Sequence, residues 1–248
     1  MAPFTTRRAA LLGALALPVL ALAACGDDAP APASSPASPV ASSGPAYPLR
    51  LSASPNPSFA IEKQPAAIVS LSPTATEVLY AVGAGGQVKA VDDQSSYPAQ
   101  APRTKLSGFQ PNVEAIAGYA PDLVILSNDS NGVADGLRKL DVPVYLMPAP
   151  DTLAGAYAQW QELGDVVGRH AQAGELVESV RKRIADAVAK APAAAKGATV
   201  YHELDQTFYS VSSATFIGDV YRQFGLTNIA DGPRRRRRGS TRSRPSRS

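Results

Sequence analysis

Blocks of apolar residues alternate with blocks of mixed apolar and polar residues through the middle of the chain. Short apolar runs bounded by turn residues predict buried strands, and stretches with apolar residues three or four positions apart predict helices. Because strand and helix alternate, we expect a parallel sheet with helices on both faces. The predicted strands are 67–71, 88–91, 122–126, 142–146 and 199–204, and the predicted helices are 75–82, 112–120, 133–140 and 215–224.

Residues 152–190 contain almost no strand-forming run and predict two helices divided near Gly164 and Gly168. The second helix, 169–190, has one apolar stripe and would be unbroken over about 33 Å at 1.5 Å per residue. A long helix after a complete strand–helix lobe favours a rigid connection between lobes. The predicted fold class is therefore α/β, with two Rossmann-like lobes joined by a long α-helix and the second lobe incomplete.

The N-terminus has the three parts of a secretion signal, with Arg7 and Arg8 before an apolar stretch, 9–24, that ends in small residues at Cys25. The stretch is shorter than the roughly 20 residues that span a bilayer. The residues before Cys25 resemble a bacterial lipobox, which implies lipidation of this cysteine. A plain secretion signal with an incidental cysteine is the alternative, and the choice between Sec and twin-arginine export stays open.

Low-complexity segments flank the predicted lobes. Residues 26–57 contain eight prolines among alanine and serine, which predicts an extended tether, and order is expected to begin near Ala66. Residues 233–248 are rich in arginine and predict a disordered tail, which we interpret as the product of a broken reading frame. Without this tail and the signal, 14 basic residues face 21 acidic ones. An arginine run can bind nucleic acid, but an exported protein has little access to it.

Candidate catalytic and metal chemistry is sparse. Cys25 is the only cysteine, and the two histidines, His170 and His202, fall on separate predicted elements. A zinc or manganese site needs several converging ligands, so no metal is expected. The chain also has no Gly-x-Ser-x-Gly motif and no phosphate loop. We therefore expect neither an enzyme nor a resident cofactor.

Two acidic residues occupy matching positions in two predicted helices. Glu77 lies six residues before Gly83, and Asp219 lies six residues before Gly225. One carboxylate in each lobe could meet arginines of a two-fold partner through charge-assisted hydrogen bonds. For Glu77 a capping box with Thr74 is the alternative interpretation.

Several motifs in order along 66–230 resemble the substrate-binding proteins of cobalamin and iron-siderophore ABC importers. They are IVSLSPTATE at 68–77, SYP at 96–98, GFQPNVE at 108–114 and PDLVI at 121–125, followed by 201–205 and 213–230. The resemblance implies two α/β lobes, a ligand in the cleft between them, and docking on the permease through Glu77 and Asp219. It further implies that the rings of Tyr97 and Phe109, followed by Gln110, contact the ligand, although Tyr97 packing on Pro98 is an alternative.

Other candidate ligand residues follow predicted strand ends, where open α/β sheets bind ligands. Asn128 and Asp129 follow the strand 122–126, although ordinary turn chemistry explains the same residues. Asp205, Phe208 and Tyr209 follow the strand 199–204 and would face the first lobe.

These observations predict the solute-binding component of an ABC importer, which captures cobalamin, haem or a ferric siderophore and delivers it to a permease with its ATPase. The protein is expected to be a monomer, without nucleic acid, lipid-anchored outside the cytoplasmic membrane or periplasmic. A membrane-anchored scaffold or adhesion protein with no solute ligand is the alternative. The predicted segments are a signal at 1–25, a tether at 26–65, the first lobe at 66–150, a helical region at 151–191, a partial second lobe at 192–232 and a tail at 233–248.

Overall fold

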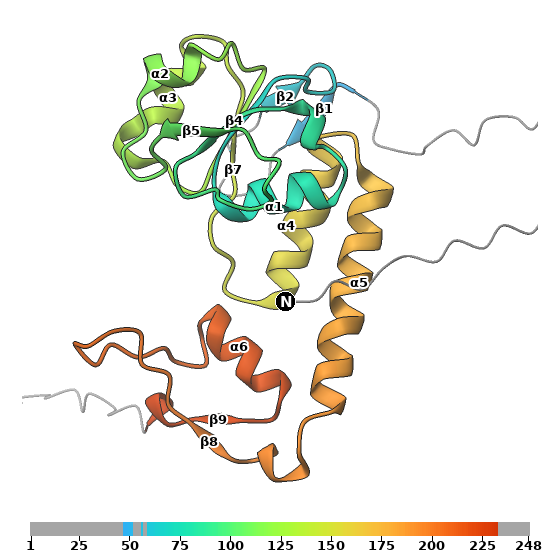
Figure 1. Cartoon of the computed structure of the whole chain (residues 1–248), viewed down its shortest axis with the longest axis vertical. Coiled ribbons are helices and arrows are strands. Elements are labelled where there is room, and N and C mark those ends of the chain that lie inside the picture. The colour runs from blue at the N-terminus through green and yellow to red at the C-terminus, as the bar shows by residue number, and fades with distance from the viewer. Residues whose placement is uncertain (1–46, 52–55, 57–58, 233–248) are drawn as a thin grey trace, which may run out of the picture. The chain divides into compact units, whose positions relative to one another are not determined.

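The computed structural model describes residues 47–51, 56 and 59–232 of the chain, and Figure 1 shows its elements. The predictions for Cys25, the signal peptide and the tail at 233–248 lie outside these residues. The strands are β1 (Leu49–Leu51), β2 (Phe59–Ile61), β3 (Ile68–Leu71), β4 (Val88–Asp92), β5 (Arg103–Leu106), β6 (Leu123–Leu126), β7 (Val144–Leu146), β8 (Thr199–Val200) and β9 (Thr227–Asn228). The α-helices are α1 (Pro73–Ala81), α2 (Val113–Ala117), α3 (Val133–Arg138), α4 (Leu153–Val166), α5 (His170–Ala189) and α6 (Phe216–Gln223).

Five parallel strands form the main sheet in the order β5-β4-β3-β6-β7. Alternate residues of each strand face opposite sides, so Ile68 and Val69 belong to different hydrophobic clusters. One cluster contains residues of α1 and α4, and the other contains residues of α2 and α3. The predicted α/β class with helices on both faces is confirmed.

The strand order reverses at the centre of this sheet. After β3 the chain adds β4 and β5 on one side, and then returns to add β6 and β7 on the other. The switch point therefore lies between β3 and β6, where the connections leave the sheet in opposite directions. Open α/β sheets bind ligands outside the carboxyl ends of such a pair of strands.

Helix α1 begins two residues earlier than predicted. Ser72, not Thr74, is the N-cap: its backbone is extended and its hydroxyl accepts a hydrogen bond from the backbone N of Ala75. Pro73 then occupies the first helical position, where its missing N–H costs nothing. The capping-box interpretation of Glu77 is therefore wrong, because a box would use the third helical residue, Ala75, and Glu77 lies two positions beyond it.

Ordered structure begins before Ala66, so that part of the tether prediction is wrong. β1 and β2 pair antiparallel, and Leu51 and Ile61 are buried in the core. Side-chain hydrogen bonds attach this segment to the main sheet and to α4. Asn56 bonds both Leu146 N and Leu146 O, at 2.6 and 2.9 Å, and the Tyr47 hydroxyl donates to Val166 O at 3.0 Å. The amide thereby pairs with the outer edge of β7. We did not predict these strands from the sequence, because prolines and serines surround each short apolar run.

Two helices fill the region predicted as helical. α4 ends at Val166 and α5 begins at His170, with Gly168 at φ +71° between them. A left-handed residue there stops the first helix, so the break at Gly168 is confirmed, whereas Gly164 lies inside α4. Gly164 instead allows close packing, because a Cβ on it would overlap with the Ala173 side chain of α5. Figure 1 shows the two helices side by side.

After α5 the described chain forms a small unit of two parallel strands, β8 and β9, with α6 between them in sequence. The predicted strand 199–204 is shorter in the structure, ending at Val200. Glu203 instead pairs with Ser210 across a tight turn, in which Asp205 accepts hydrogen bonds from both the backbone and the hydroxyl of Thr207. The turn competes with the strand for the same backbone groups. Strand β5 was not predicted, because its sequence RTKL is polar and it lies at a sheet edge.

Candidate functional site

A cavity of about 450 Å³ lies at the switch point of the main sheet. Ser72 follows β3, Ser127 follows β6 and Met147 follows β7, and all three residues line it. Its volume falls within the range of about 300–1,000 Å³ that is usual for small-molecule sites. The complete lining is Ser72, Pro73, Thr74, Ser127, Met147, Pro148, Ala149, Pro150, Ala156, Gln159, Trp160 and Phe216.

Two aromatic residues of the cavity come from different helices. Trp160 belongs to α4, which borders the sheet, and Phe216 is the first residue of α6. The Trp160 ring meets the Tyr157 ring edge to face, with centroids 5.7 Å apart. This contact and the core around α4 fix the indole on one side of the cavity. The cavity therefore includes residues from both the sheet-containing lobe and the segment after α5.

Gln159 supplies a polar group on the same helix. Its Nε2 donates a hydrogen bond of 2.9 Å to the backbone O of Pro148. Its Oε1 is buried and has no hydrogen-bond partner among the described residues. A buried acceptor without a donor costs free energy, so a ligand N–H or O–H that reached it would be favoured.

We did not predict Trp160, Phe216 or Gln159 as site residues from the sequence. Trp160 lies inside a predicted helix, where a large apolar residue ordinarily packs in the core, and Phe216 follows a helix cap. One signal was available, because Trp160 is the only tryptophan of the chain. Its role could not be predicted, however, because the cavity depends on how α6 lies against α4.

The four predicted aromatic ligand residues are exposed and lie outside this cavity. Tyr97 and Phe109 are on the loops after β4 and β5, and Phe208 and Tyr209 are on the turn before α6. Each ring is about two-thirds exposed or more, so each is open to a partner. Gln110 is exposed beside Phe109. Their ligand contacts stay predictions.

The predicted polar ligand residues have partners within their own turns. Asn128 bonds the hydroxyls of Ser127 and Ser130, and Asp129 accepts a 2.9 Å hydrogen bond from Ala134 N at the start of α3. Hydrogen bonds from Thr207 lower the pKa of Asp205, which keeps this exposed carboxyl ionised. These contacts favour turn chemistry for Asn128, Asp129 and Asp205, and their ligand role stays a prediction.

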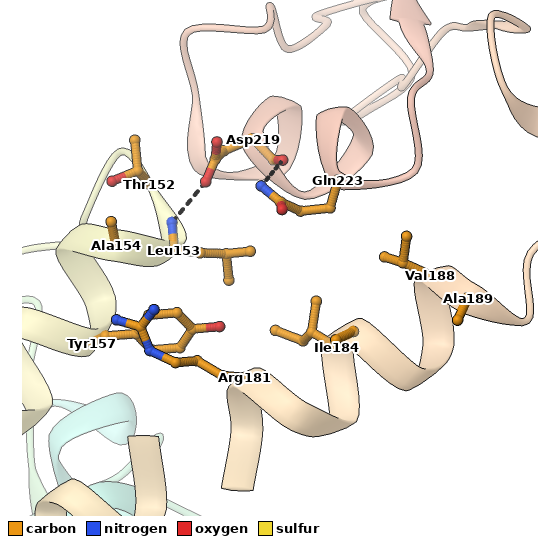
Figure 2. A pocket seen from close by; sticks show the side chains of 11 residues that line it. Thr152, Leu153, Ala154, Tyr157, Arg181, Ile184, Val188, Ala189, Asp219 and Gln223 are labelled. Carbon is orange, nitrogen blue, oxygen red and sulfur yellow. Dashed lines mark hydrogen bonds between the residues drawn. The ribbon is translucent and has the colours of Figure 1, made fainter. Parts of the chain in front are cut away.

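Glu77 and Asp219 lie in different environments although both lie six residues before a left-handed glycine. Glu77 is exposed, and it lines two small surface hollows together with Tyr97. Asp219 is only 6% exposed. Figure 2 shows its carboxylate accepting a hydrogen bond from the backbone N of Leu153, at 2.8 Å. This bond and that of Arg222 lower the pKa of Asp219.

Asp219 therefore acts within the chain as a partner for the N-terminus of α4. Leu153 is the first residue of α4, and Thr152 caps the same helix through its hydroxyl on Gly155 N. A carboxylate at a helix N-terminus is stabilised by the exposed N–H groups and the helix dipole. This intramolecular use does not support docking by Asp219, which stays a prediction.

A second cavity, of about 690 Å³, lies between α4, α5 and α6. Ile184 and Val188 of α5 face Leu153 of α4 across it, as Figure 2 shows, and the guanidinium of Arg181 lies 4.4 Å from the centre of the Tyr157 ring. The lining is mainly aliphatic, but it lies away from the carboxyl ends of the sheet. It is a weaker candidate for a ligand site.

Within the described ranges, 47–51, 56 and 59–232, no three His, Cys, Asp or Glu residues gather as a metal site, and no helix has the length and apolarity to cross a membrane. Each histidine has its own polar partner, His170 with Asp165 and His202 with Tyr221.

The sequence profile described as "Periplasmic binding protein" matches residues 68–247. The chain is 28% identical to the uncharacterized ABC transporter substrate-binding lipoprotein YvrC of Bacillus subtilis, over 90% of this chain and 73% of that protein. It is 31% identical to a cobalamin-binding protein of Halobacterium salinarum, over 71% of this chain but only 49% of the relative.

A crystal structure of a possible iron-binding periplasmic solute-binding protein from Staphylococcus epidermidis shares the fold, with a TM-score of 0.60. Identity is 23%, and the match covers 67% of each chain. The fold and the ordered motifs thus agree with the profile, which spans well over half of the sequence. The chain belongs to the periplasmic binding protein family.

Proposed function

We propose that this chain is the solute-binding component of an ABC importer and that it binds a large planar or chelate ligand, such as cobalamin, haem or a ferric siderophore. One observation carries this proposal: an apolar cavity lies at the switch point of the sheet, with Trp160 and Phe216 contributed by two separate helices. A ligand in that position would contact both parts of the chain.

The lining favours a ligand with a large apolar surface and few polar groups. Aromatic rings bind flat conjugated systems by stacking or edge contacts, while Gln159 and the hydroxyls of Ser72 and Ser127 can bond polar groups at the rim. The exposed rings of Tyr97 and Phe109 would extend the contact area for a ligand larger than the cavity. The Halobacterium relative is a cobalamin-binding protein, which supports the ligand class.

The single tryptophan provides a direct test, because Trp160 lines the cavity. Titration with cyanocobalamin, haemin or ferrichrome should quench Trp160 fluorescence in a saturable way for at least one of them. Phe216→Ala should weaken binding of that ligand about tenfold, which corresponds to loss of a buried aromatic contact of about 1.4 kcal/mol.

Controls separate the cavity from other exposed rings. Tyr119→Ala removes a ring that is outside the cavity lining and should leave the affinity unchanged. Trp160→Phe should lose the optical signal while equilibrium dialysis still detects binding. Saturable binding of none of the three ligands would refute the proposed ligand class.

Delivery to the permease is proposed to use Glu77. Its side chain is exposed, and Ser72 rather than Glu77 stabilises the start of α1, so the carboxylate is available to an arginine of a partner. Glu77→Ala should leave ligand affinity unchanged and reduce stimulation of the transporter ATPase in vesicles at least severalfold. Glu114→Ala, also exposed but on α2, is the matched control. Equal stimulation by both variants would contradict docking through Glu77.

Anchoring is proposed to occur through Cys25, which precedes the described residues. The predicted lipobox supports it, as does the lipoprotein from Bacillus subtilis. Mass spectrometry of the membrane fraction should find a diacylglyceryl cysteine as the first residue of the processed chain. Recovery of Cys25→Ala in the same membrane fraction would argue for another attachment.

A further inference from the structure

A network of buried polar side chains lies behind the loops that carry Tyr97 and Phe109. Ser70 is on β3, Thr76 on α1, Asp92 at the end of β4 and Ser95 on the loop after it, and each is almost completely buried. The cavity lining uses none of these four residues. Buried polar groups are retained where their hydrogen bonds fix a particular arrangement of the chain.

Asp92 is the charged member and is 3% exposed. Its Oδ1 accepts a hydrogen bond of 2.8 Å from Ser95 N. The Ser95 hydroxyl is 3.0 Å from Oγ1 of Thr76, and Thr76 donates to the Ser70 hydroxyl at 2.9 Å. The loop after β4 is therefore attached through Asp92 and Ser95 to the core beneath α1.

The other carboxylate oxygen of Asp92 faces the loop after β5. A Cβ on Gly108 would overlap with Oδ2 of Asp92 and would meet the backbone O of Leu71 at 3.4 Å. Only a residue without a side chain lets the loop approach so closely. Ser107 then fixes the next turn, because its hydroxyl accepts hydrogen bonds from Phe109 N and Gln110 N, at 3.3 and 3.0 Å.

One carboxylate thus contacts two loops that are separate in sequence. Tyr97 lies two residues after Ser95, and Phe109 directly follows Gly108. Both rings project into solvent, so neither packs deeply enough to hold its own loop. We propose that Asp92 is a positioning residue that fixes the two loops against each other and thereby sets the placement of the Tyr97 and Phe109 rings for ligand. The effect of Asp92 on ligand binding rests on the proposed function, whereas its effect on the two loops does not.

The Asp92 carboxyl lies in surroundings that disfavour its charged form. Burial raises the pKa of Asp92, and the neighbouring Asp93 raises it further. No salt bridge joins Asp92 to a cation within residues 59–232. The neutral isostere Asn keeps an acceptor for Ser95 N, so Asp92→Asn should preserve the arrangement, whereas Asp92→Ala should not.

Hydrogen exchange measured by mass spectrometry on the unliganded full chain tests the arrangement without any ligand. Asp92→Ala should speed exchange about tenfold or more in both 93–98 and 107–110, because loss of the buried acceptor for Ser95 N favours local opening by that factor. Asp92→Asn should stay within about threefold of the native chain in both segments. Gly108→Ala, which pushes against Oδ2 from the other side, should loosen the same two segments.

Leu137→Ala is the matched control, because Leu137 is fully buried in α3 and has no place in either loop. It should lower the melting temperature without selective exchange in 93–98 and 107–110. If either loop exchanges at the native rate in both Asp92→Ala and Gly108→Ala, the inference is overturned. Equal loosening by Asp92→Asn or by Leu137→Ala would overturn it too.

Binding is measured on the same variants with cyanocobalamin, haemin and ferrichrome as probes. Where the native chain binds one of them, Asp92→Ala should raise its Kd about tenfold, and Asp92→Asn should keep it within about threefold of the native value. If the native chain binds none of the three, the ligand proposal fails while the exchange data still decide the role of Asp92. An unchanged Kd in Asp92→Ala, together with loosened loops, would refute the positioning role for ligand.

Discussion

Hydrogen bonding at single residues distinguishes the two acidic positions that sequence spacing made equivalent. Both precede a left-handed glycine by six residues, but Glu77 lies five positions after its N-cap, Ser72, and Asp219 lies four after Thr215. One position along a helix rotates a side chain by about 100°. Counting back from the glycine could therefore identify the repeated helix, but not which side chain faces solvent.

The hydrogen bonds that Asp219 accepts from Leu153 N and Arg222 lead to a prediction about pH. A carboxyl whose folded pKa is lowered contributes stability above its unfolded pKa of about 3.9, and this contribution is lost as pH falls through the folded value. The chemical shift of the Leu153 amide should therefore titrate with a midpoint below about 3.9. Asp219→Asn should abolish that titration. The Gly155 amide, bonded to the uncharged Thr152, is the internal control. A midpoint at or above the ordinary value would contradict the bond.

Candidate ligand residues were predicted from the sequence only where they lie on loops. Exposed aromatics such as Tyr97 and Phe109 stand out in a sequence because they follow strand ends and interrupt polar turns. Trp160 does not stand out, because a tryptophan in an amphipathic helix ordinarily packs in the core. Asp92 is hidden for another reason: its partners Ser95 and Gly108 meet only when β4 and β5 pair.

At the scale of elements, periodicity located the core strands and the two long helices well. β3 and β6 are buried on all four positions, which gives continuous apolar runs, and α5 has a regular stripe. The missed strands β1, β2 and β5 are short or polar, so their formation depends on neighbours already in place. Residue preferences alone cannot reveal such edge strands, because packing and pairing decide them.

Packing between α4 and α5 leads to a prediction with a built-in comparison. A methyl group at Gly164 would overlap with Ala173, so Gly164→Ala should lower the free energy of unfolding by about 1–3 kcal/mol. Gly174 is on α5 with only Gln161 nearby, at 3.6 Å from an added Cβ. Gly174→Ala should instead raise stability by about 0.5–1 kcal/mol, because alanine favours the helix. Urea denaturation of both variants measures the difference, and the same sign for both would contradict the packing.

At the scale of the whole molecule, the described chain has an uneven distribution of buried surface. The main sheet has hydrophobic clusters on both faces, whereas the segment 199–232 has two strands of two residues each and several exposed large apolar side chains. These exposed residues are Tyr201, Leu204, Phe208, Tyr209 and Ile229. The local sequence pattern predicted both units, but it could not predict how much buried apolar surface stabilises each one. The division into a first lobe at 66–150 and a partial lobe at 192–232 therefore stays a prediction.

The unequal burial of the main sheet and of segment 199–232 predicts that the two unfold locally at different free energies. A segment with few buried apolar contacts opens at a lower free energy than a core sheet, so exchange should separate the two units. Amides of β3 and β6 should exchange only through global unfolding, while those of 199–232 should exchange at least 100-fold faster, which corresponds to about 2.7 kcal/mol. Within residues 59–232, limited proteolysis should cut first in 201–215, because that stretch is exposed and has little regular structure. A ligand that contacts both Trp160 and Phe216 would link α6 to α4, so its binding should slow exchange in 199–232 more than in β3. Exchange of the whole chain in a single cooperative step, with or without ligand, would mean that the two units share one core.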